Sequence, residues 1–216
     1  MLRQMVDKIA DNPEELLRAA IASGRLQPNE RLVEADLRRR LGVGRSAVRT
    51  ALVRLEQEGL VSHERHRGAR VRLVDAEEAV EILEARAVLE GLTARHAATR
   101  ATDADVEQLR AILTEMRQLL DAGDLLGASE QNAVLHRRLL EIAGHSTAQR
   151  LIATLKSQLV RFQYRTILLP GRRDASLAEH TAIVDAVAAG DPDAAESAMR
   201  RHLSRVAQAL ASAGDG

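Results

Sequence analysis

The sequence predicts a mostly α-helical protein, with an N-terminal winged helix-turn-helix and a C-terminal all-α bundle of six or seven helices. Three observations lead to this fold class. Two short amphipathic segments meet at a glycine-containing turn within residues 34–58. Two strand-like segments follow them. From residue 75 onward, apolar residues recur at helical spacing without strand-like alternation.

Length and composition restrict the class of protein. The 216 residues are enough for two modest domains, each with its own core. The chain has no cysteine, which excludes a disulfide framework and a thiolate zinc site. Its two aromatic residues, Phe162 and Tyr164, offer no platform for stacking single-stranded bases. Charges interrupt every long apolar run and no signal peptide is evident, so we expect a cytoplasmic protein with no membrane partner.

The neutral overall charge conceals an asymmetry along the chain. Residues 1–74 hold 15 Lys and Arg against 10 Asp and Glu, whereas the remaining 142 residues hold 16 against 21. A basic N-terminal part suits a polyanion-binding module, and the acidic remainder suits a different task. The predicted domains are therefore 1–74, a polyanion-binding module, and 75–216, a second module with a different role.

The N-terminal elements follow in order. Residues 5–23 are expected to form a helix that Asn12-Pro13 kinks or restarts, and residues 26–32 a turn. Leu37 and Leu41 then give the first helix of the helix-turn-helix an apolar side, and Gly42 ends it.

The second helix of this motif has two different faces. Its apolar residues share one side, and the other side holds cationic or hydroxylic residues, namely Arg45, Ser46, Arg49 and Thr50. Arginine can bind guanine O6 and N7 with two hydrogen bonds, and serine or threonine can bind phosphate. The pattern therefore predicts a DNA-recognition helix. The alternative is an ordinary helical hairpin with solvated arginines.

Two strands at 61–65 and 69–73 are expected to form a hairpin around Arg67-Gly68. A hairpin after a helix-turn-helix is the wing of a winged helix. His66, Arg67 and Arg70 would lie at its tip, where they could contact phosphate or the minor groove. A solvated basic turn is the alternative interpretation.

The C-terminal part predicts six helices separated by short breaks that carry capping or helix-ending residues. Six helices within about 140 residues indicate an all-α bundle. The predicted helices are 76–100, 103–122, 124–143, 146–168, 174–189 and 192–213.

Three histidines in this bundle are candidate metal ligands. Asn132 and His136 are four residues apart on one helix and share a face, while His180 and His202 lie on two other helices. Three imidazoles and an oxygen donor would suit zinc or another first-row divalent ion. Spacing cannot show that the side chains converge, so the residues alone favour separate polar side chains.

The N-terminal sequence IASGRLQPNERLVEADLRRRLGVGRSAVRTALVRLEQEGLVSHERHRGARV resembles the DNA-binding domain of GntR-type bacterial transcription regulators. The resemblance covers about fifty residues and implies that Arg45 and Arg49 read bases and phosphates, flanked by Ser46 and Ala47. Three residues depart from the family pattern: Asn29, Gly44 and Ala47. Gly44 stands where a serine or threonine usually caps the recognition helix. The further predicted DNA contacts are Arg38, His66, Arg67 and Gly68.

The segments ILEARAVLEGLTAR, NAVLHRRLLEIAGH and EHTAIVDAVAAGDPDAAESAMRRHL resemble the FCD effector domain of FadR-type GntR regulators. The resemblance implies a divalent metal, with zinc expected and nickel or manganese as alternatives, and a small carboxylic acid that completes its coordination. The implied ligands are Asn132, His136, His180 and His202. Asn132 replaces the commoner aspartate, which leaves the site one negative charge short.

The candidates for effector binding are Arg86, Arg161 and Tyr164. Arginine can grip a planar carboxylate with two hydrogen bonds, although an ordinary salt bridge on a helix surface is the alternative for each arginine.

These features together predict a DNA-binding regulator that is not an enzyme. A homodimer would place two winged helices on a palindromic operator, with repression relieved by a small organic acid as the expected mode and activation equally compatible. One alternative is the same regulator with a metal-independent or apolar ligand. A second is a metal-dependent hydrolase, which the absence of an HExxH motif and of paired catalytic carboxylates disfavours.

Overall fold

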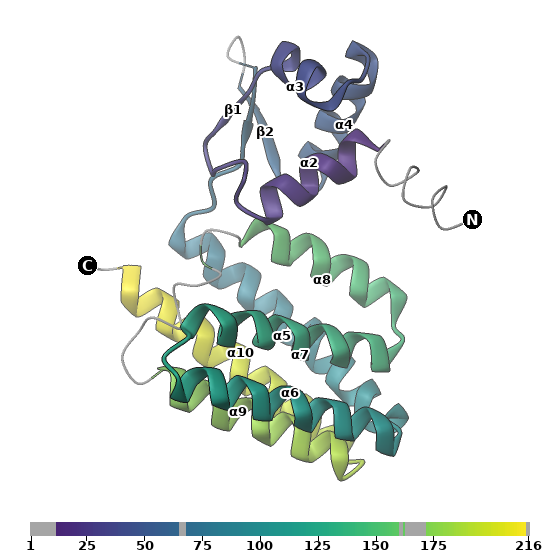
Figure 1. The fold of residues 1–216 in the computed structure, drawn as a ribbon, viewed down its shortest axis with the longest axis vertical. Helices are drawn as coiled ribbons and strands as arrows, with labels where there is room; N and C mark the ends of the chain where they lie inside the picture. The colour runs from purple at the N-terminus through teal and green to yellow at the C-terminus, as the bar shows by residue number, and fades with distance from the viewer. Residues whose placement is uncertain (1–11, 65–67, 160–161, 163–171, 215–216) are drawn as a thin grey trace. The chain divides into compact units, whose positions relative to one another are not determined.

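The computed structural model describes residues 12–64, 68–159, 162 and 172–214. The chain divides into two compact units, one formed by residues 1–74 with 156–161 and the other by residues 75–155 with 162–216. Nine α-helices and three short strands occur within the described residues (Figure 1).

The first unit holds three helices: α2 (Pro13–Ala22), α3 (Glu34–Leu41) and α4 (Arg45–Gln57). Helix α2 begins at Pro13, where the missing N–H costs nothing, and the Asn12 side chain accepts a hydrogen bond from the Glu14 backbone N–H. The predicted restart at Asn12-Pro13 is therefore the start of a helix, while residues 5–11 of the predicted segment lie outside the described part of the chain. Helix α3 ends at Gly42, whose φ of +68° favours glycine.

The strands are β1 (Arg31–Leu32), β2 (Val61–Glu64) and β3 (Gly68–Val71), antiparallel in the order β1-β3-β2. The predicted hairpin is confirmed as β2 and β3, whereas the predicted turn at 26–32 is wrong at its end, because residues 31–32 form β1 and add a third strand to the sheet. Leu32 pairs with Ala69 and its side chain is buried, which gives this short segment a reason to join the sheet. Two residues are too few to show a strand periodicity in the sequence.

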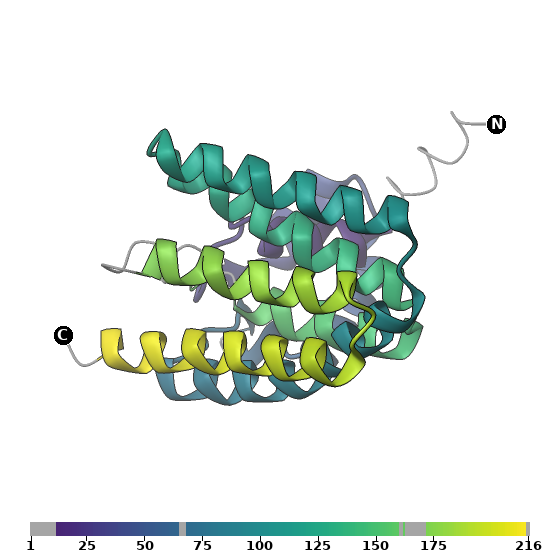
Figure 2. The same cartoon turned by 90° about the horizontal axis from the view of Figure 1, so that it is seen from below.

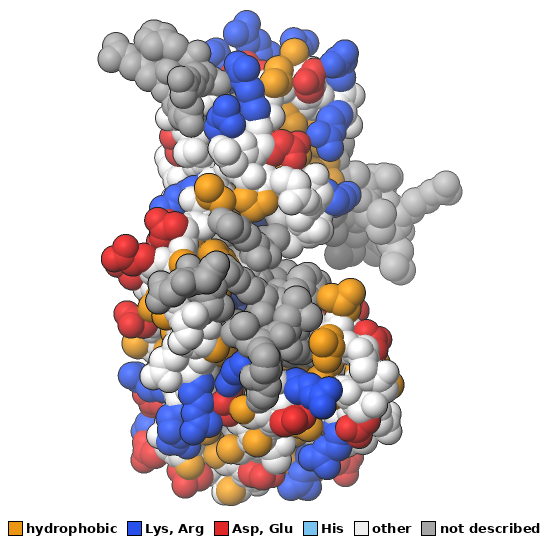
Figure 3. Space-filling model, turned by 90° about the vertical axis from the view of Figure 1, so that its left-hand side faces the viewer, with side chains coloured by type: hydrophobic (Ala, Val, Ile, Leu, Met, Phe, Trp, Pro, Cys, Tyr) orange, Lys and Arg blue, Asp and Glu red, His pale blue; other side chains and the backbone are white. Residues whose placement is uncertain are grey.

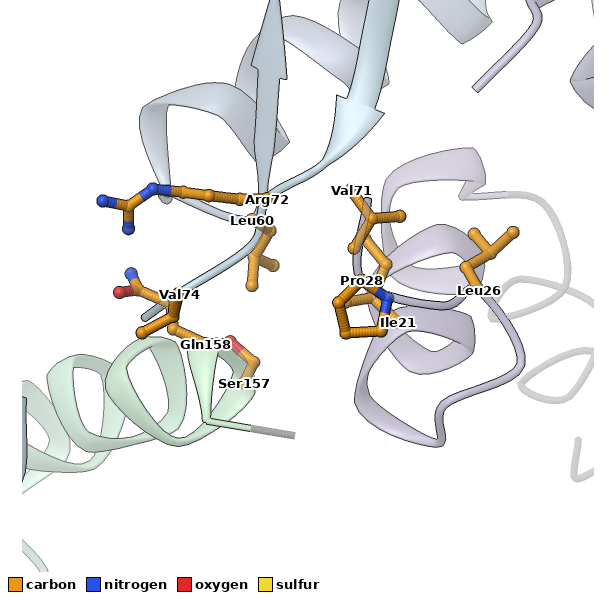
Figure 4. A pocket seen from close by; sticks show the side chains of 10 residues that line it. Ile21, Leu26, Pro28, Leu60, Val71, Arg72, Val74, Ser157 and Gln158 are labelled. Atoms are coloured by element: carbon orange, nitrogen blue, oxygen red, sulfur yellow. The ribbon is translucent and has the colours of Figure 1, made fainter. Parts of the chain in front are cut away.

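The core of the first unit is assembled from all of these elements. A small hollow in this unit is lined by apolar and polar side chains, among them Ile21 of α2, Leu60, Val71 and Arg72 (Figure 4). The inward residues of α4 belong to the same core, and at least 97% of each side chain is buried: Val48, Ala51, Leu52 and Leu55. Burial of this face turns Arg45, Ser46 and Arg49 outward.

The second unit is an all-α bundle (Figures 1 and 2). Helix α10 packs along α5 and α9, α7 packs against α5 and α6, and α6 also contacts α9. None of the described helices has the length and apolarity needed to cross a membrane. The bundle helices are α5 (Ala76–Arg100), α6 (Asp103–Asp121), α7 (Leu125–Ala143), α8 (Ser146–Gln158), α9 (Arg172–Ala188) and α10 (Pro192–Gly214).

Five of the six predicted bundle helices agree with the structure to within two residues at each end. Their caps explain this, as at α6, where the Thr102 hydroxyl accepts from Asp105 N–H and the Asp105 side chain accepts from Thr102 N–H. The predicted helix over 146–168 extends too far, because α8 ends at Gln158 and Leu159 lies in a turn; residues 160–161 and 163–168 of this prediction lie outside the described residues. No glycine or proline precedes Pro170 in this segment, so the sequence lacked the signal that marks a helix end.

Candidate metal centre and nucleic-acid interface

Three helices of the bundle each contribute one histidine to a buried cluster. His136 of α7, His180 of α9 and His202 of α10 are 4%, 0% and 3% exposed. One ring nitrogen from each residue lies within 4.8 Å of the others, and Nε2 of His136 is 3.2 Å from Nε2 of His180. The structure therefore brings together three imidazoles that are far apart in the sequence.

Asn132 supplies an oxygen on the same helix, one turn before His136. Its Oδ1 atom is buried and accepts no hydrogen bond from the described residues. Buried amide oxygens nearly always have a partner, and an orphaned one needs a physical reason, such as an ion or a ligand. Asn132 and the three histidines therefore fit a metal-binding role as a set.

Two buried glutamates hold the outer sides of two of the imidazoles. Nδ1 of His136 lies 2.7 Å from Oε2 of Glu90 on α5, and Nδ1 of His202 lies 2.8 Å from Oε2 of Glu179 on α9, so each pair is within hydrogen-bond distance. Because Nδ1 is taken in each ring, Nε2 is the nitrogen left for a ligand. His180 has a weaker partner, since its Nδ1 lies 3.4 Å from the Ser176 hydroxyl.

Arginines fix both carboxylates in turn. Nε and Nη2 of Arg86 lie 2.8 and 2.7 Å from Oε1 of Glu90. Arg172 makes two bonds to Glu179, at 2.9 and 3.1 Å, and Arg205 adds a contact at 3.3 Å. Burial alone would raise the pKa of Glu179, but the hydrogen bonds from His202 and Arg172 lower it from 4.5 to about 2. The carboxylate is therefore ionised at neutral pH.

The electrostatics of the cluster favour the neutral form of His180. Burial lowers the pKa of His180 well below the usual 6.5, and the neighbouring His202 and His136 lower it further. Neutral imidazole nitrogens and an amide oxygen are donors that suit zinc and nickel, and manganese less well. A divalent ion bound by this set would keep its full positive charge, because none of the four donors is anionic.

The predicted recognition helix α4 presents its arginines to solvent. The Arg45 and Arg49 side chains are 66% and 62% exposed, and both pair with Glu34 at the start of α3, at 3.4 and 3.1 Å. Ser46 and Arg38 are also exposed, and Ala47 is half-buried. Arginine side chains gather on the upper surface in Figure 3, which belongs to this unit. The face is accessible and cationic, as a DNA-reading surface requires.

The departure at Gly44 has a visible local consequence. Gly44 is the N-cap of α4, and no side chain caps the helix there. Of the predicted wing residues, Gly68 is exposed with φ +84°, whereas His66 and Arg67 lie outside the described residues. Arg70 does not stand at a free tip: its Nη1 donates to the Asn29 backbone oxygen at 3.0 Å.

The effector candidates are placed only in part. Arg86 is 12% exposed and binds Glu90, so the structure shows it holding a carboxylate of the protein itself. Arg161 and Tyr164 lie outside the described residues. Our sequence reasoning missed the roles of Glu90, Glu179 and Arg172. Two signals were present: the i, i+4 spacing of Arg86 and Glu90, and Glu179 directly before His180.

A winged helix-turn-helix joined to an all-α domain defines a class of protein, the two-domain DNA-binding transcription regulators. Comparison with family models identifies the particular family. Residues 10–71 match the bacterial regulatory proteins of the gntR family, and residues 81–205 match the FCD domain. The chain belongs to the GntR family of transcription regulators with an FCD domain, which are not enzymes.

Individual relatives agree with this assignment. One relative is a protein of Escherichia coli (strain K12) that is named as an L-lactate dehydrogenase operon regulator. It is 31% identical, and the match covers 94% of this chain and 85% of the relative's length. The transcriptional repressor NanR of Enterobacter sp. (strain 638) is 29% identical, and the match covers 99% of this chain and 88% of NanR. The solved structure of E. coli McbR/YncC has the same fold, with a TM-score of 0.76 at 20% identity, over 95% of this chain and 98% of that one.

Proposed function

We propose that this regulator is a homodimeric repressor, acting on a palindromic operator in the cytoplasm, whose DNA binding responds to a small carboxylic acid held at a divalent-metal site in the bundle. The observation that carries the proposal is the cluster of three buried histidines, together with the buried Oδ1 of Asn132, which lies one helical turn before His136 and has no hydrogen-bond partner among the described residues. Relatives named as repressors, NanR among them, support the sign of regulation.

The DNA-reading role belongs to the exposed face of α4. Arg45 and Arg49 would exchange Glu34 for guanine edges or phosphates, a change that their exposure makes easy. Ser46 and Arg38 would add phosphate contacts. In a dimer, two such helices would enter successive major grooves of a two-fold symmetric site.

The metal role belongs to Asn132, His136, His180 and His202. A bound divalent ion would supply Lewis acidity and an open coordination position for an anionic oxygen. The donors are neutral, and the two nearby glutamates are already paired with arginines. An excess positive charge would therefore remain at the centre, and a carboxylate effector would neutralise it.

A hollow between α9 and α10 also supports an anionic effector. It is lined by Ala178, Ala182 and Ala198, with Arg201 and Arg205 among its charged residues and the Glu179–His202 pair at its side. Small side chains leave room there, and the arginines favour an anion over a neutral or apolar ligand. Binding of an acid to the bundle and of the operator to α4 would be linked reciprocally.

The metal content of freshly purified, untagged protein tests the proposal, measured by mass spectrometry beside a His136→Ala control. We expect near-stoichiometric zinc, nickel or manganese in the natural protein and none in the variant. Operator binding is then titrated with acetate, L-lactate and citrate, and at least one acid should weaken it only in metal-loaded protein. A natural protein that stays empty after metal is offered would refute the metal-dependent mechanism.

The alternative regulator, with a metal-independent or apolar ligand, makes a different prediction. A His180→Ala, His202→Ala double variant would keep its response to the effector, whereas the proposal requires that the response be lost. The other alternative, a metal-dependent hydrolase, is excluded by family membership.

A further inference from the structure

We propose that Glu90 and Glu179 are positioning residues of the histidine cluster, which fix His136 and His202 in the Nδ1–H tautomer and turn Nε2 of both rings toward one point. The inference rests on the proposed metal function, because oriented Nε2 atoms serve to bind an ion. The orientation itself depends only on hydrogen bonds within the chain, which can be tested without metal.

The first argument is the pattern of hydrogen bonds. Two histidines on different helices each direct Nδ1 to a glutamate, at 2.7 and 2.8 Å. A buried carboxylate can only accept hydrogen bonds while it is ionised, so it selects the tautomer with the proton on Nδ1. Nε2 of each ring then carries a lone pair that must find a proton or a metal ion.

The second argument is the rigidity of the carboxylates. Glu90 and Glu179 are 1% and 7% exposed, and each is bound by an arginine that contacts its Oε1 atom while Oε2 accepts from the histidine. Neither carboxylate can rotate away without breaking a buried ion pair, which is costly. The histidine rings are therefore oriented before any ion arrives.

The third argument is the contrast with His180. It has a serine neighbour in place of a carboxylate, with Ser176 Oγ 3.4 Å from Nδ1. His180 Nε2 lies 3.2 Å from His136 Nε2, a distance at which one of the two atoms donates to the other in the absence of an ion. If His136 is fixed as an acceptor, His180 must be the donor. The glutamates thus fix the tautomers of His136 and His202, and the tautomer of His180 follows from that of His136.

The experiment compares Glu90→Gln and Glu179→Gln with the unchanged chain in the full-length protein. The matched control is Glu196→Gln, which makes the same chemical change in the same bundle at a glutamate paired with Arg200 and Arg95. If glutamine perturbs the fold, the Arg86→Met, Glu90→Met double variant removes both buried partners together and leaves no unpaired charge.

The first readout is the tautomer of each histidine in metal-free protein, from the nitrogen chemical shifts of labelled imidazole rings. We expect Nδ1–H at His136 and His202 and Nε2–H at His180, with mixed tautomers at His136 in Glu90→Gln and at His202 in Glu179→Gln. Nε2–H at His136 and His202 in the unchanged protein would overturn the inference.

The second readout is zinc affinity, measured by competition with a chelator. Each glutamine variant should bind zinc about 10- to 100-fold more weakly, and Glu196→Gln as tightly as the unchanged protein. Equal affinity in all four proteins would also overturn the inference. If the unchanged protein takes up no zinc, the proposed metal function fails, and the tautomers alone then decide whether the glutamates position the rings.

Discussion

The two units use ion pairs in opposite ways. In the first unit, Glu34 pairs with Arg45 and Arg49 at the surface, where the side chains are 35%, 66% and 62% exposed. In the second unit, Glu90 pairs with Arg86 and His136 at 1% exposure of its side chain. Both sites combine a glutamate with two basic partners, so the difference between them is the surrounding solvent.

The difference separates a charge that can be exchanged from a charge that is fixed. Water screens an exposed pair, and breaking it costs at most about 1 kcal/mol, so DNA can replace Glu34 as the partner of the arginines. Removing one member of a buried pair costs about 3–5 kcal/mol, so Glu90 stays where the fold puts it. The exposed pair suits recognition of an external ligand, and the buried pair suits orientation of a histidine.

The largest expected effect tests this contrast directly. Glu90→Ala should lower the free energy of unfolding by about 3–5 kcal/mol, because it leaves Arg86 buried without its carboxylate. Glu34→Ala should lower it by no more than about 1 kcal/mol. Chemical denaturation of both variants measures the difference. Similar losses in the two variants would show that burial does not separate the two sites.

The next effect concerns what the exposed arginines read. Arg49→Ala should weaken operator binding by about 1–3 kcal/mol if Arg49 contacts a base, with relaxed preference at one base pair. Arg40→Ala is the matched control, an exposed arginine of the same unit for which no DNA contact is predicted. Binding measured on a set of operator variants distinguishes the roles: an equal loss on every sequence would reassign Arg49 to phosphate, and no loss would refute the recognition-helix assignment.

A smaller effect depends on pH. A hydrogen bond from Arg54, with another from Arg18, lowers the pKa of Glu14 below its usual 4.5, although burial opposes this. A lowered carboxyl pKa contributes stability that is present above pH 4.5 and is lost as the pH falls through the folded-state value.

Glu14→Gln should therefore lower the thermal unfolding midpoint at about pH 6, and the gap to the unchanged protein should narrow toward about pH 3. We expect the loss of unfolding free energy to be below about 1 kcal/mol, since Arg54 is largely exposed. Unfolding scans across this range make the test. A gap that is constant with pH would show that the charge of Glu14 is not its source.

The smallest effect comes from the helix cap at position 44. Gly44→Ser should raise the free energy of unfolding by a few tenths of a kcal/mol (roughly 0.3), because the hydroxyl can accept a backbone N–H at the start of α4. A Cβ at Gly44 would meet no atom within 4 Å, so the change is sterically open. Gly44→Ala, which lacks the hydroxyl, is the control and should destabilise the helix. A serine variant no more stable than the alanine variant would show that the hydroxyl does not cap α4.

The sequence by itself determined most of the helices and which face of α4 carries its exposed arginines. Periodicity and caps are local properties, so the turn at Gly42 and the cap at Thr102 could be read from neighbouring residues. The outward face of α4 followed from the spacing of its apolar residues. Where the local signal was weak, the sequence reasoning missed the two-residue strand β1 and carried α8 past its end at Gln158.

Apart from the resemblance to the FCD domain, only the tertiary structure decided which distant side chains meet. His136, His180 and His202 are 44 and 22 residues apart, and no local rule gives the rotation of three helices about their axes. The same packing placed Glu90 behind His136, at a separation of 46 residues, and left Oδ1 of Asn132 without a hydrogen-bond partner in the described part of the chain. The physical reason is that burial in a bundle is settled by all the contacting faces together, whereas a helix is settled mainly by its own residues.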